Sequence, residues 1–106
     1  MNTANTNIEK NTKTVKLDSP LTLAGGKTIE EVTVRKPNAG ALRGVALTDI
    51  FRLQTDAIQA VLPRVTEPPL VKQQVLELDP ADLVSLGSAV MHFLLPKADR
   101  ADFLPE

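Results

Sequence analysis

The chain has 106 residues, with 12 basic and 13 acidic side chains and a formal net charge of −1. This near balance argues against strong electrostatic attraction to nucleic acid or to an anionic membrane. The absence of cysteine excludes disulfides and thiolate metal sites, and the aromatic residues are three Phe. One small domain with a mainly aliphatic core is therefore expected.

The two ends of the chain are predicted to be flexible. Residues 1–13 are rich in Asn and Thr and lack the apolar core of a signal peptide, and residues 96–106 are charged. No apolar run approaches the length that spans a membrane. We therefore expect a soluble, unexported protein whose domain occupies residues 14–95.

Two strands are predicted in the first third of this domain. Apolar and polar side chains alternate over residues 15–17 and again over residues 32–34, which indicates half-buried strands. The glycine pair 25–26 supplies a turn between them. Ile29 has the opposite parity to the second strand, which predicts a bulge or an irregular entry near Glu30.

Helices are predicted from the middle of the chain onward. Asn38 can cap a short turn over residues 39–43, which Gly44 ends. Thr48 can cap a longer helix to about Leu62, stopped by Pro63. Its apolar stripe consists of Ile50, Leu53, Ala57, Ile58 and Val61, widened by Phe51 and Leu62.

Two more helices complete the prediction. Thr66 is expected to cap a short third helix that contains Pro68 and Pro69 in its first turn. Asp79 and Pro80 start a fourth helix, which Pro96 closes. The apolar face of this fourth helix consists of Leu83, Leu86, Gly87, Val90 and Leu94. The expected fold class is α+β, a small N-terminal antiparallel β-hairpin packed on three to four short helices.

Motifs that suggest chemistry have simpler explanations. The sequence GGKT at residues 25–28 resembles the end of a phosphate-binding loop, but Leu21 stands where that loop needs a glycine, so a turn is favoured. His92, the single histidine, is expected on the polar side of the last helix without partner ligands for a metal. Asp79 and Asp82 lie in a first helical turn, where carboxylates satisfy free amides. No catalytic residue, cofactor or metal site is predicted, and the chain is not expected to be an enzyme.

A basic edge is predicted beside the second strand, formed by Arg35, Lys36 and Arg43. Nucleic-acid binding would require aromatic stacking groups or further basic residues. A charged rim around a protein-binding surface is favoured over nucleic-acid binding.

The order of these parts resembles one known family. The segments "KLDSPLTLAGGKTIEEVTVRKPNAGALRGV", "LPRVTEPP" and "LELDPADLVSLGSAVMHFL", within about residues 14–95, are similar to the tail assembly chaperones of contractile-tailed bacteriophages and prophages. The resemblance implies a cytoplasmic protein of the bacterial host. It would bind the tape measure protein, keep it soluble until tail tube subunits polymerise, and stay out of the virion. The alternative is a structural subunit or adaptor retained in a tail particle.

The resemblance also implies partners and a longer product. The tail tube protein and a longer form of the chain made by minus-one ribosomal frameshifting are expected partners, and the chain can form homo-oligomers. Phe-Leu pairs at residues 93–94 and 103–104 are positions where a slippery codon sequence could lie. Neither nucleic acid nor a membrane is expected as a partner.

A face that binds the client, the tape measure protein, is proposed on the segment that leads from the second strand into the helices. Its apolar members are Leu42, Val45, Leu47 and Phe51, with Arg35 and Arg43 at the rim. The alternative, slightly favoured, is that all four apolar side chains belong to the core.

Overall fold

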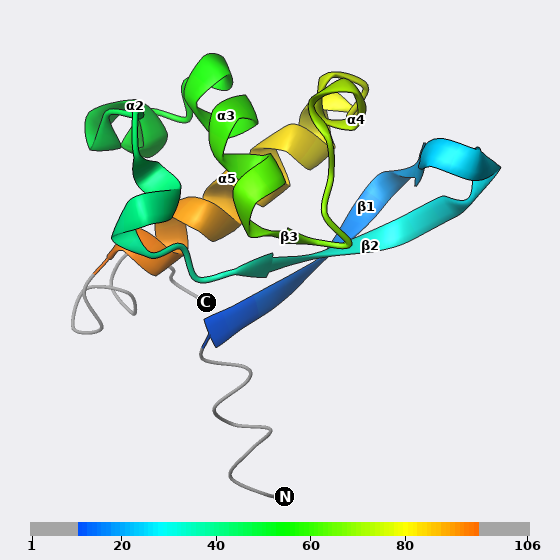
Figure 1. Ribbon diagram of the computed structural model, residues 1–106, viewed down its shortest axis with the longest axis horizontal. Coiled ribbons are helices and arrows are strands. Elements are labelled where there is room, and N and C mark those ends of the chain that lie inside the picture. The colour runs from blue at the N-terminus through cyan, green and yellow to red at the C-terminus, as the bar shows by residue number, and fades with distance from the viewer. Residues whose placement is uncertain (1–10, 96–106) are drawn as a thin grey trace, which may run out of the picture.

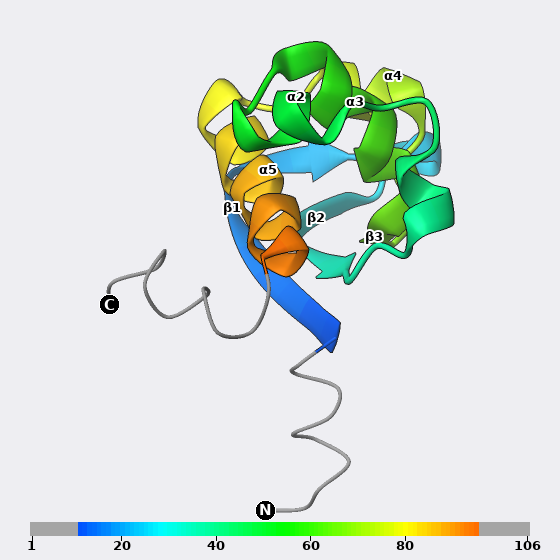
Figure 2. The same ribbon diagram turned by 90° about the vertical axis from the view of Figure 1, so that its left-hand side faces the viewer.

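A three-stranded antiparallel sheet carries all of the helices on one of its faces. The structure, a computed structural model, describes residues 11–95. Strands β1 (Thr12–Thr22), β2 (Thr28–Arg35) and β3 (Thr66–Glu67) lie in the order β1-β2-β3. Figures 1 and 2 show the helical layer on one side of this sheet, with the other sheet face uncovered by helices. The predicted α+β class and the N-terminal hairpin are confirmed, and β3 is an addition.

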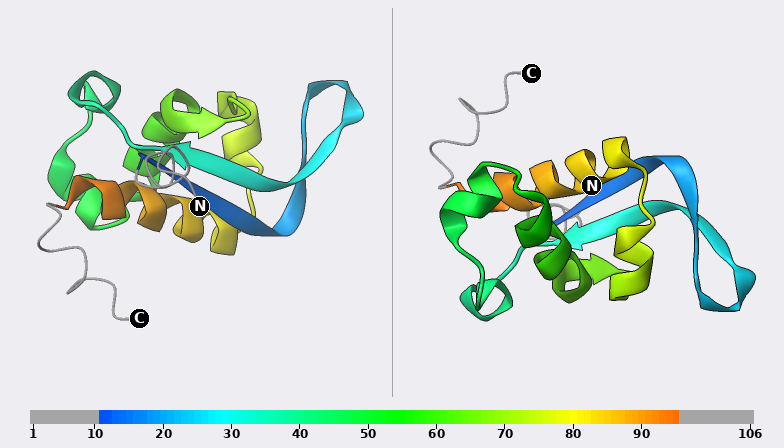
Figure 3. Two further views of the ribbon diagram at one scale, coloured as in Figure 1. Left: turned by 90° about the horizontal axis from the view of Figure 1, so that it is seen from below. Right: turned by 90° about the horizontal axis from the view of Figure 1, so that it is seen from above.

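The helical layer consists of short elements followed by one longer helix. They are η2 (Ala39–Leu42), α2 (Leu47–Phe51), α3 (Thr55–Val65), α4 (Lys72–Leu76) and α5 (Pro80–Leu94). A 3-10 turn, η1 (Ala24–Gly26), lies at the tip of the hairpin. There Gly25 and Gly26 both have φ of 89°, a conformation that glycine adopts without steric cost, so the predicted turn is confirmed. The hairpin tip extends beyond the helices in Figure 3.

The irregularity predicted near Glu30 exists, but the extra residues belong to β1. Lys16 pairs with Glu31 and Leu21 pairs with Ile29, so residues 17–20 stand opposite one residue of β2. The bulge is fixed by Asp82 of α5. The Asp82 carboxylate accepts hydrogen bonds from the backbone amides of Asp18 at 2.7 Å and of Ser19 at 3.1 Å.

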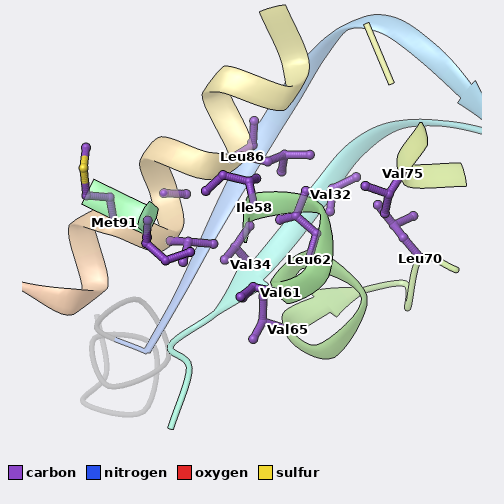
Figure 4. Close-up of a cluster of buried hydrophobic side chains, with 14 of the residues drawn as sticks. Val32, Val34, Ile58, Val61, Leu62, Val65, Leu70, Val75, Leu86 and Met91 are labelled. Carbon is purple, nitrogen blue, oxygen red and sulfur yellow. The ribbon is translucent and has the colours of Figure 1, made fainter. Parts of the chain in front are cut away.

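The core lies between the sheet and the helices α3 and α5. Figure 4 shows side chains of β2, α3 and α5 meeting there, with α4 and the segment before it closing one end. Val32 and Val34 of β2 are fully buried, as are Val61 and Leu62 of α3. The other buried apolar residues include Val15, Leu17, Ile50, Ile58, Val65, Leu70, Val75, Leu86 and Val90.

The predicted long helix over residues 48–62 is wrong, because the chain forms α2 and α3 with a break between them. Leu53 has a φ of 55°, the left-handed conformation. The amide of Leu53 donates to the carbonyl of Ile50 and that of Gln54 to the carbonyl of Asp49, the Schellman pattern that ends a helix. Gln54, not Thr48, then caps α3 by accepting a hydrogen bond from the amide of Ala57 at 3.0 Å. The apolar stripe continues across this break, so periodicity did not reveal it.

The predicted stop at Pro63 and the predicted cap at Thr66 are also wrong. Pro63 lies inside α3, which runs on to Val65. Pro63 has no N–H to donate to the Gln59 carbonyl and its ring crowds that carbonyl, but only the last two residues of the helix follow it. Thr66 belongs to β3 and pairs with Val34. Its buried hydroxyl donates to the Leu62 carbonyl at 2.8 Å and accepts from the Leu70 amide at 3.2 Å. Thr66 therefore ties the end of α3 to the segment before α4 and caps no helix of its own.

Other local predictions hold. Asn38 caps η2 through a hydrogen bond from the Ala41 amide, and Gly44 has a φ of 81° in the turn after it. Asp79 caps α5 by accepting from the Ala81 amide, with Pro80 as the first helical residue. Thr12 and Lys13 belong to β1, although the sequence assigned them to the flexible tail. Residues 1–10 and 96–106, with the predicted tails, Pro96 and the second Phe-Leu pair, lie outside the described residues.

Candidate functional site

Two large apolar side chains of α2 project into solvent. Leu47 is 51% exposed and Phe51 is 42% exposed, although both are of types that usually lie in cores. They are four residues apart, so they lie on the same side of the helix. Ile50, on the adjoining side of the helix, is fully buried and holds α2 against the core. We call Leu47 and Phe51 the apolar ridge.

The other two apolar members of the predicted face are less exposed than the apolar ridge. Leu42 of η2 and Val45, in the turn before α2, are half-buried and pack against the core. The alternative that all four apolar side chains are core residues is therefore wrong for the apolar ridge and fits Leu42 and Val45 better. Together the four residues run from the core outward to the surface of α2.

The basic rim residues take part in a network that also contains Arg64, which sequence analysis did not single out. Arg64 of α3 donates from Nη1 to the carbonyls of Ala41 and Arg43, each at 2.9 Å. Arg35 donates to the carbonyl of Arg64 at 3.1 Å and forms an exposed ion pair with Glu67 at 3.4 Å. Arg64 therefore holds the η2 loop against the end of α3. Its partners are backbone carbonyls, for which the sequence gives no signal.

A second apolar surface lies at the opposite end of the helical layer. Val71 is 56% exposed and Leu76 of α4 is 52% exposed. Beside them, α3 and α4 border a hollow of about 370 Å³, whose lining includes Ala60, Pro63 and Leu76. Figure 1 places α3 between α2 and α4, so this surface and the apolar ridge are separate. Sequence analysis missed this surface because it predicted that the third helix starts after Thr66, whereas α4 starts at Lys72.

The edges of the sheet are poor sites for an added strand. On the free edge, β1 carries Lys13 and Lys16, and its bulge spans residues 17–20. On the other edge, β3 covers only Thr33 and Val34 of β2 and is followed by Pro68 and Pro69, and the uncovered part of β2 carries the charged residues Glu30 and Glu31. Lysines, bulges, short strands and prolines all oppose pairing with another chain. Contacts with a partner are therefore expected on the helical layer and not along the sheet edges.

The residues considered for chemistry have structural positions. Asp79 caps α5, whereas Asp82 is 1% exposed and holds the β1 bulge, so the prediction that both serve their own helix is wrong for Asp82. His92 is half-buried, and its ring lies edge-on to that of Phe93 with centroids 5.8 Å apart. Within residues 11–95, no group of three or more His, Asp or Glu is arranged to hold a metal ion. No helix in this same range is long and apolar enough to cross a membrane.

The described residues form a small α+β domain with an exposed apolar ridge and a basic network. Residues 14–95 match the family described as phage tail assembly chaperone proteins, E, or 41 or 14, and the chain belongs to this family. The resemblance found in the sequence is thereby confirmed, and the chain has a role in phage tail assembly. The family description is of a chaperone and includes no enzymatic reaction.

Two proteins of Escherichia phage P2 are similar to this chain. Tail assembly protein E is 44% identical over 84 residues, which cover 79% of this chain and 91% of protein E. Tail assembly protein E′ is 42% identical over 89 residues, which cover 84% of this chain and 62% of protein E′. Protein E′ is therefore the longer of the two. No solved structure matches the chain.

Proposed function

We propose that the chain is a tail assembly chaperone that binds the phage tape measure protein in the host bacterial cytoplasm. It keeps this client soluble until the tail tube polymerises, and it is not retained in the virion. The proposal is supported by membership of the chaperone family and by the two tail assembly proteins of phage P2. Its partners are the tape measure protein, the tail tube protein and a longer form of the chain itself, and further copies of the chain can join it on the client.

The observation that carries client binding is the exposure of the apolar ridge. Fully burying an exposed Leu or Phe side chain contributes about 1.5–3 kcal/mol. Leu47 is 51% and Phe51 42% exposed, so covering them with a client contributes roughly half of that for each side chain. The ridge is on a short helix held by Ile50, so a client gains this contact without unfolding the domain. Two side chains on one helical face suit an apolar surface with limited sequence specificity, as a client-coating protein requires.

The position of α5 supports a longer form that keeps the whole domain. The last described helix ends at Leu94, and its core residues Leu86, Val90 and Phe93 precede that end. A change of reading frame at either Phe-Leu pair would leave every described strand and helix intact. The longer form would then differ from the shorter one only in the residues after the chaperone domain, as would suit two products that share one client.

Co-expression with the tape measure protein tests client binding. The unmodified chain should keep the tape measure protein in the soluble fraction and co-purify with it. The double substitution Leu47→Ser and Phe51→Ser should lose co-purification while retaining the circular dichroism of the folded domain. A matched control, Val84→Ser, removes an apolar side chain of α5 that is 53% exposed and should leave co-purification unchanged. Equal binding by the ridge variant would show that the ridge is not the client surface.

The composition of purified tails separates a chaperone from a structural subunit or adaptor. Mass spectrometry of tails should detect the tape measure and tube proteins without a stoichiometric amount of this chain. A constant number of copies per tail would contradict the chaperone proposal and favour the retained subunit. Intact-mass analysis of N-terminally tagged products from the native gene with its downstream DNA should also reveal a minor longer product.

A further inference from the structure

A hollow lined by hydrogen-bond donors lies between the end of β2, the η2 loop and the end of α3. Its volume is about 270 Å³, and its lining includes Arg35, Lys36, Asn38, Gly40 and Arg64. We call it the basic hollow. No residue of its lining carries a carboxylate.

The two guanidinium groups of the basic hollow are held in fixed positions. Arg64 is anchored by two hydrogen bonds of 2.9 Å to the carbonyls of Ala41 and Arg43. Both bonds use Nη1, so the other N–H groups of Arg64 remain for a ligand. Arg35 is in turn anchored to the carbonyl of Arg64 at 3.1 Å. A cation held in place by backbone carbonyls loses little side-chain entropy when it binds an anion.

A neutral donor and an exposed cation complete the lining. The side-chain oxygen of Asn38 accepts a hydrogen bond from the Ala41 amide at 2.9 Å, so the amide nitrogen of Asn38 is left with two N–H donors. Lys36 is exposed. Glu67 supplies a counter-charge to Arg35 from outside the lining, in an ion pair exposed to solvent. The lining therefore offers several donors and an excess of positive charge to a ligand that accepts hydrogen bonds.

We propose that the basic hollow binds carboxylate side chains of an acidic segment of a partner protein. A carboxylate has two oxygens that match the parallel N–H groups of a guanidinium, and such charge-assisted bonds are stronger than neutral ones. A nucleic acid is a poorer fit. Residues 11–95 contain two phenylalanines, Phe51 and Phe93, and Phe93 is buried, so base stacking has little support. The inference goes beyond the proposed function because it names the chemistry that is recognised and holds whichever protein supplies it.

Titration of the ¹⁵N-labelled chain with a capped peptide of alternating Glu and Ser tests the proposal at low ionic strength. Saturable shifts are expected at amides of residues 36, 38–41 and 64–65, and a capped peptide of alternating Lys and Ser should produce none. Lys36→Ala should weaken the affinity about 1.4- to 5-fold, the range typical of an exposed charge pair. Lys27→Ala, at the hairpin tip, is the matched control and should have no effect.

Arg64→Lys provides a second variant that keeps the charge but loses the fork of donors. It should weaken peptide binding more than Lys27→Ala does while the domain stays folded. Shifts spread evenly over Lys13, Lys16 and Lys27, or an equal loss in Lys36→Ala and Lys27→Ala, would overturn the proposal. Tighter binding of a single-stranded oligonucleotide of equal charge at residues 36–41 would replace it with a nucleic-acid site. The titration does not use the tape measure protein. A negative titration would therefore count against the basic hollow alone, and a negative co-expression result would count against client binding.

Discussion

Asp82 of α5 and Asp18 of β1 are joined by a 2.7 Å hydrogen bond between a buried carboxylate and a backbone amide. A second bond, from the Ser19 amide at 3.1 Å, occupies the other carboxylate oxygen. The bulge in β1 leaves amides that β2 does not pair, and Asp82 supplies their acceptors. These bonds therefore fix the start of α5 to the middle of β1, although Asp82 and Asp18 are 64 residues apart in the sequence.

Asp82→Asn is expected to lower the free energy of unfolding by about 1–3 kcal/mol. The substituted amide offers one oxygen where two amides need acceptors, and its NH₂ group faces a donor. Urea denaturation followed by circular dichroism measures the change. Asp18→Asn is the matched control, because the Asp18 side chain is exposed and its backbone amide is unchanged. Equal losses in both variants would show that the Asp82 carboxylate does not hold the bulge.

Two phenylalanines allow the apolar ridge to be separated from the core. Phe93→Ala should cost about 3–5 kcal/mol of stability, because Phe93 is 6% exposed and its removal leaves a cavity. Phe51→Ala should cost less than about 1 kcal/mol, because Phe51 is 42% exposed. Thermal and urea unfolding of the two variants provide the comparison. A large loss in Phe51→Ala would mean that the ridge is needed for folding and would weaken its assignment to a client.

Gly87 is expected to be intolerant of a larger residue. A Cβ atom at this position would lie 3.1 Å from the Ile58 side chain and 3.2 Å from the Leu53 side chain, so a larger residue would push these two side chains away from α5. Gly87→Val should destabilise the domain by about 1–3 kcal/mol through overpacking. Ser85→Val, at an exposed position of the same helix, introduces the same side chain without the clash and with little change in helix propensity. Because replacing glycine by valine raises helix propensity, a loss of stability in Gly87→Val would come from packing. Similar unfolding midpoints for the two variants would contradict this packing argument.

Arg64→Ala should loosen the η2 loop. Loss of the two bonds from Nη1 leaves the carbonyls of Ala41 and Arg43 without this donor, with a net effect of about 1 kcal/mol on an exposed loop. Hydrogen exchange should become faster at amides of residues 41–45 and remain unchanged in α5. Arg52→Ala, which removes an exposed arginine that forms none of these bonds, is the control. Unchanged exchange in the loop would show that Arg64 is dispensable for its conformation.

Local sequence signals predicted the parts of the fold that depend on short-range chemistry. The glycine turn and the Asn38 and Asp79 caps follow from residues close in sequence. Of the predicted apolar face of α5, Leu86, Gly87 and Val90 are buried and Leu83 and Leu94 are half-buried, whereas the buried Ala89, Met91 and Phe93 were not predicted. The helix break at Leu53 could not be predicted, because a left-handed leucine is unusual and depends on packing against Gly87. Strand β3 also depends on distant pairing, between Thr66 and Val34.

The sequence grouped the members of the candidate face but did not predict which of them are exposed. Sequence analysis selected Leu47 and Phe51 together with Leu42 and Val45, since all four are apolar and close in the chain. Exposure separates them, because the turn at Gly44 and the helix break direct α2 outward while its Ile50 faces the core. Arg64 was missed because its role comes from contacts with carbonyls 21 and 23 residues earlier.

The open face of the sheet is hydrophilic, with Thr14 and Thr33 hydrogen-bonded at 3.1 Å and Lys16 opposite Glu31. Copies that bind a client through the helical layer would carry this face away from it. A client coated in this way would present a hydrated outer surface of mixed charge, and such surfaces oppose aggregation. The hydrophilic face of the sheet would then keep many coated clients soluble at high concentration in an infected cell.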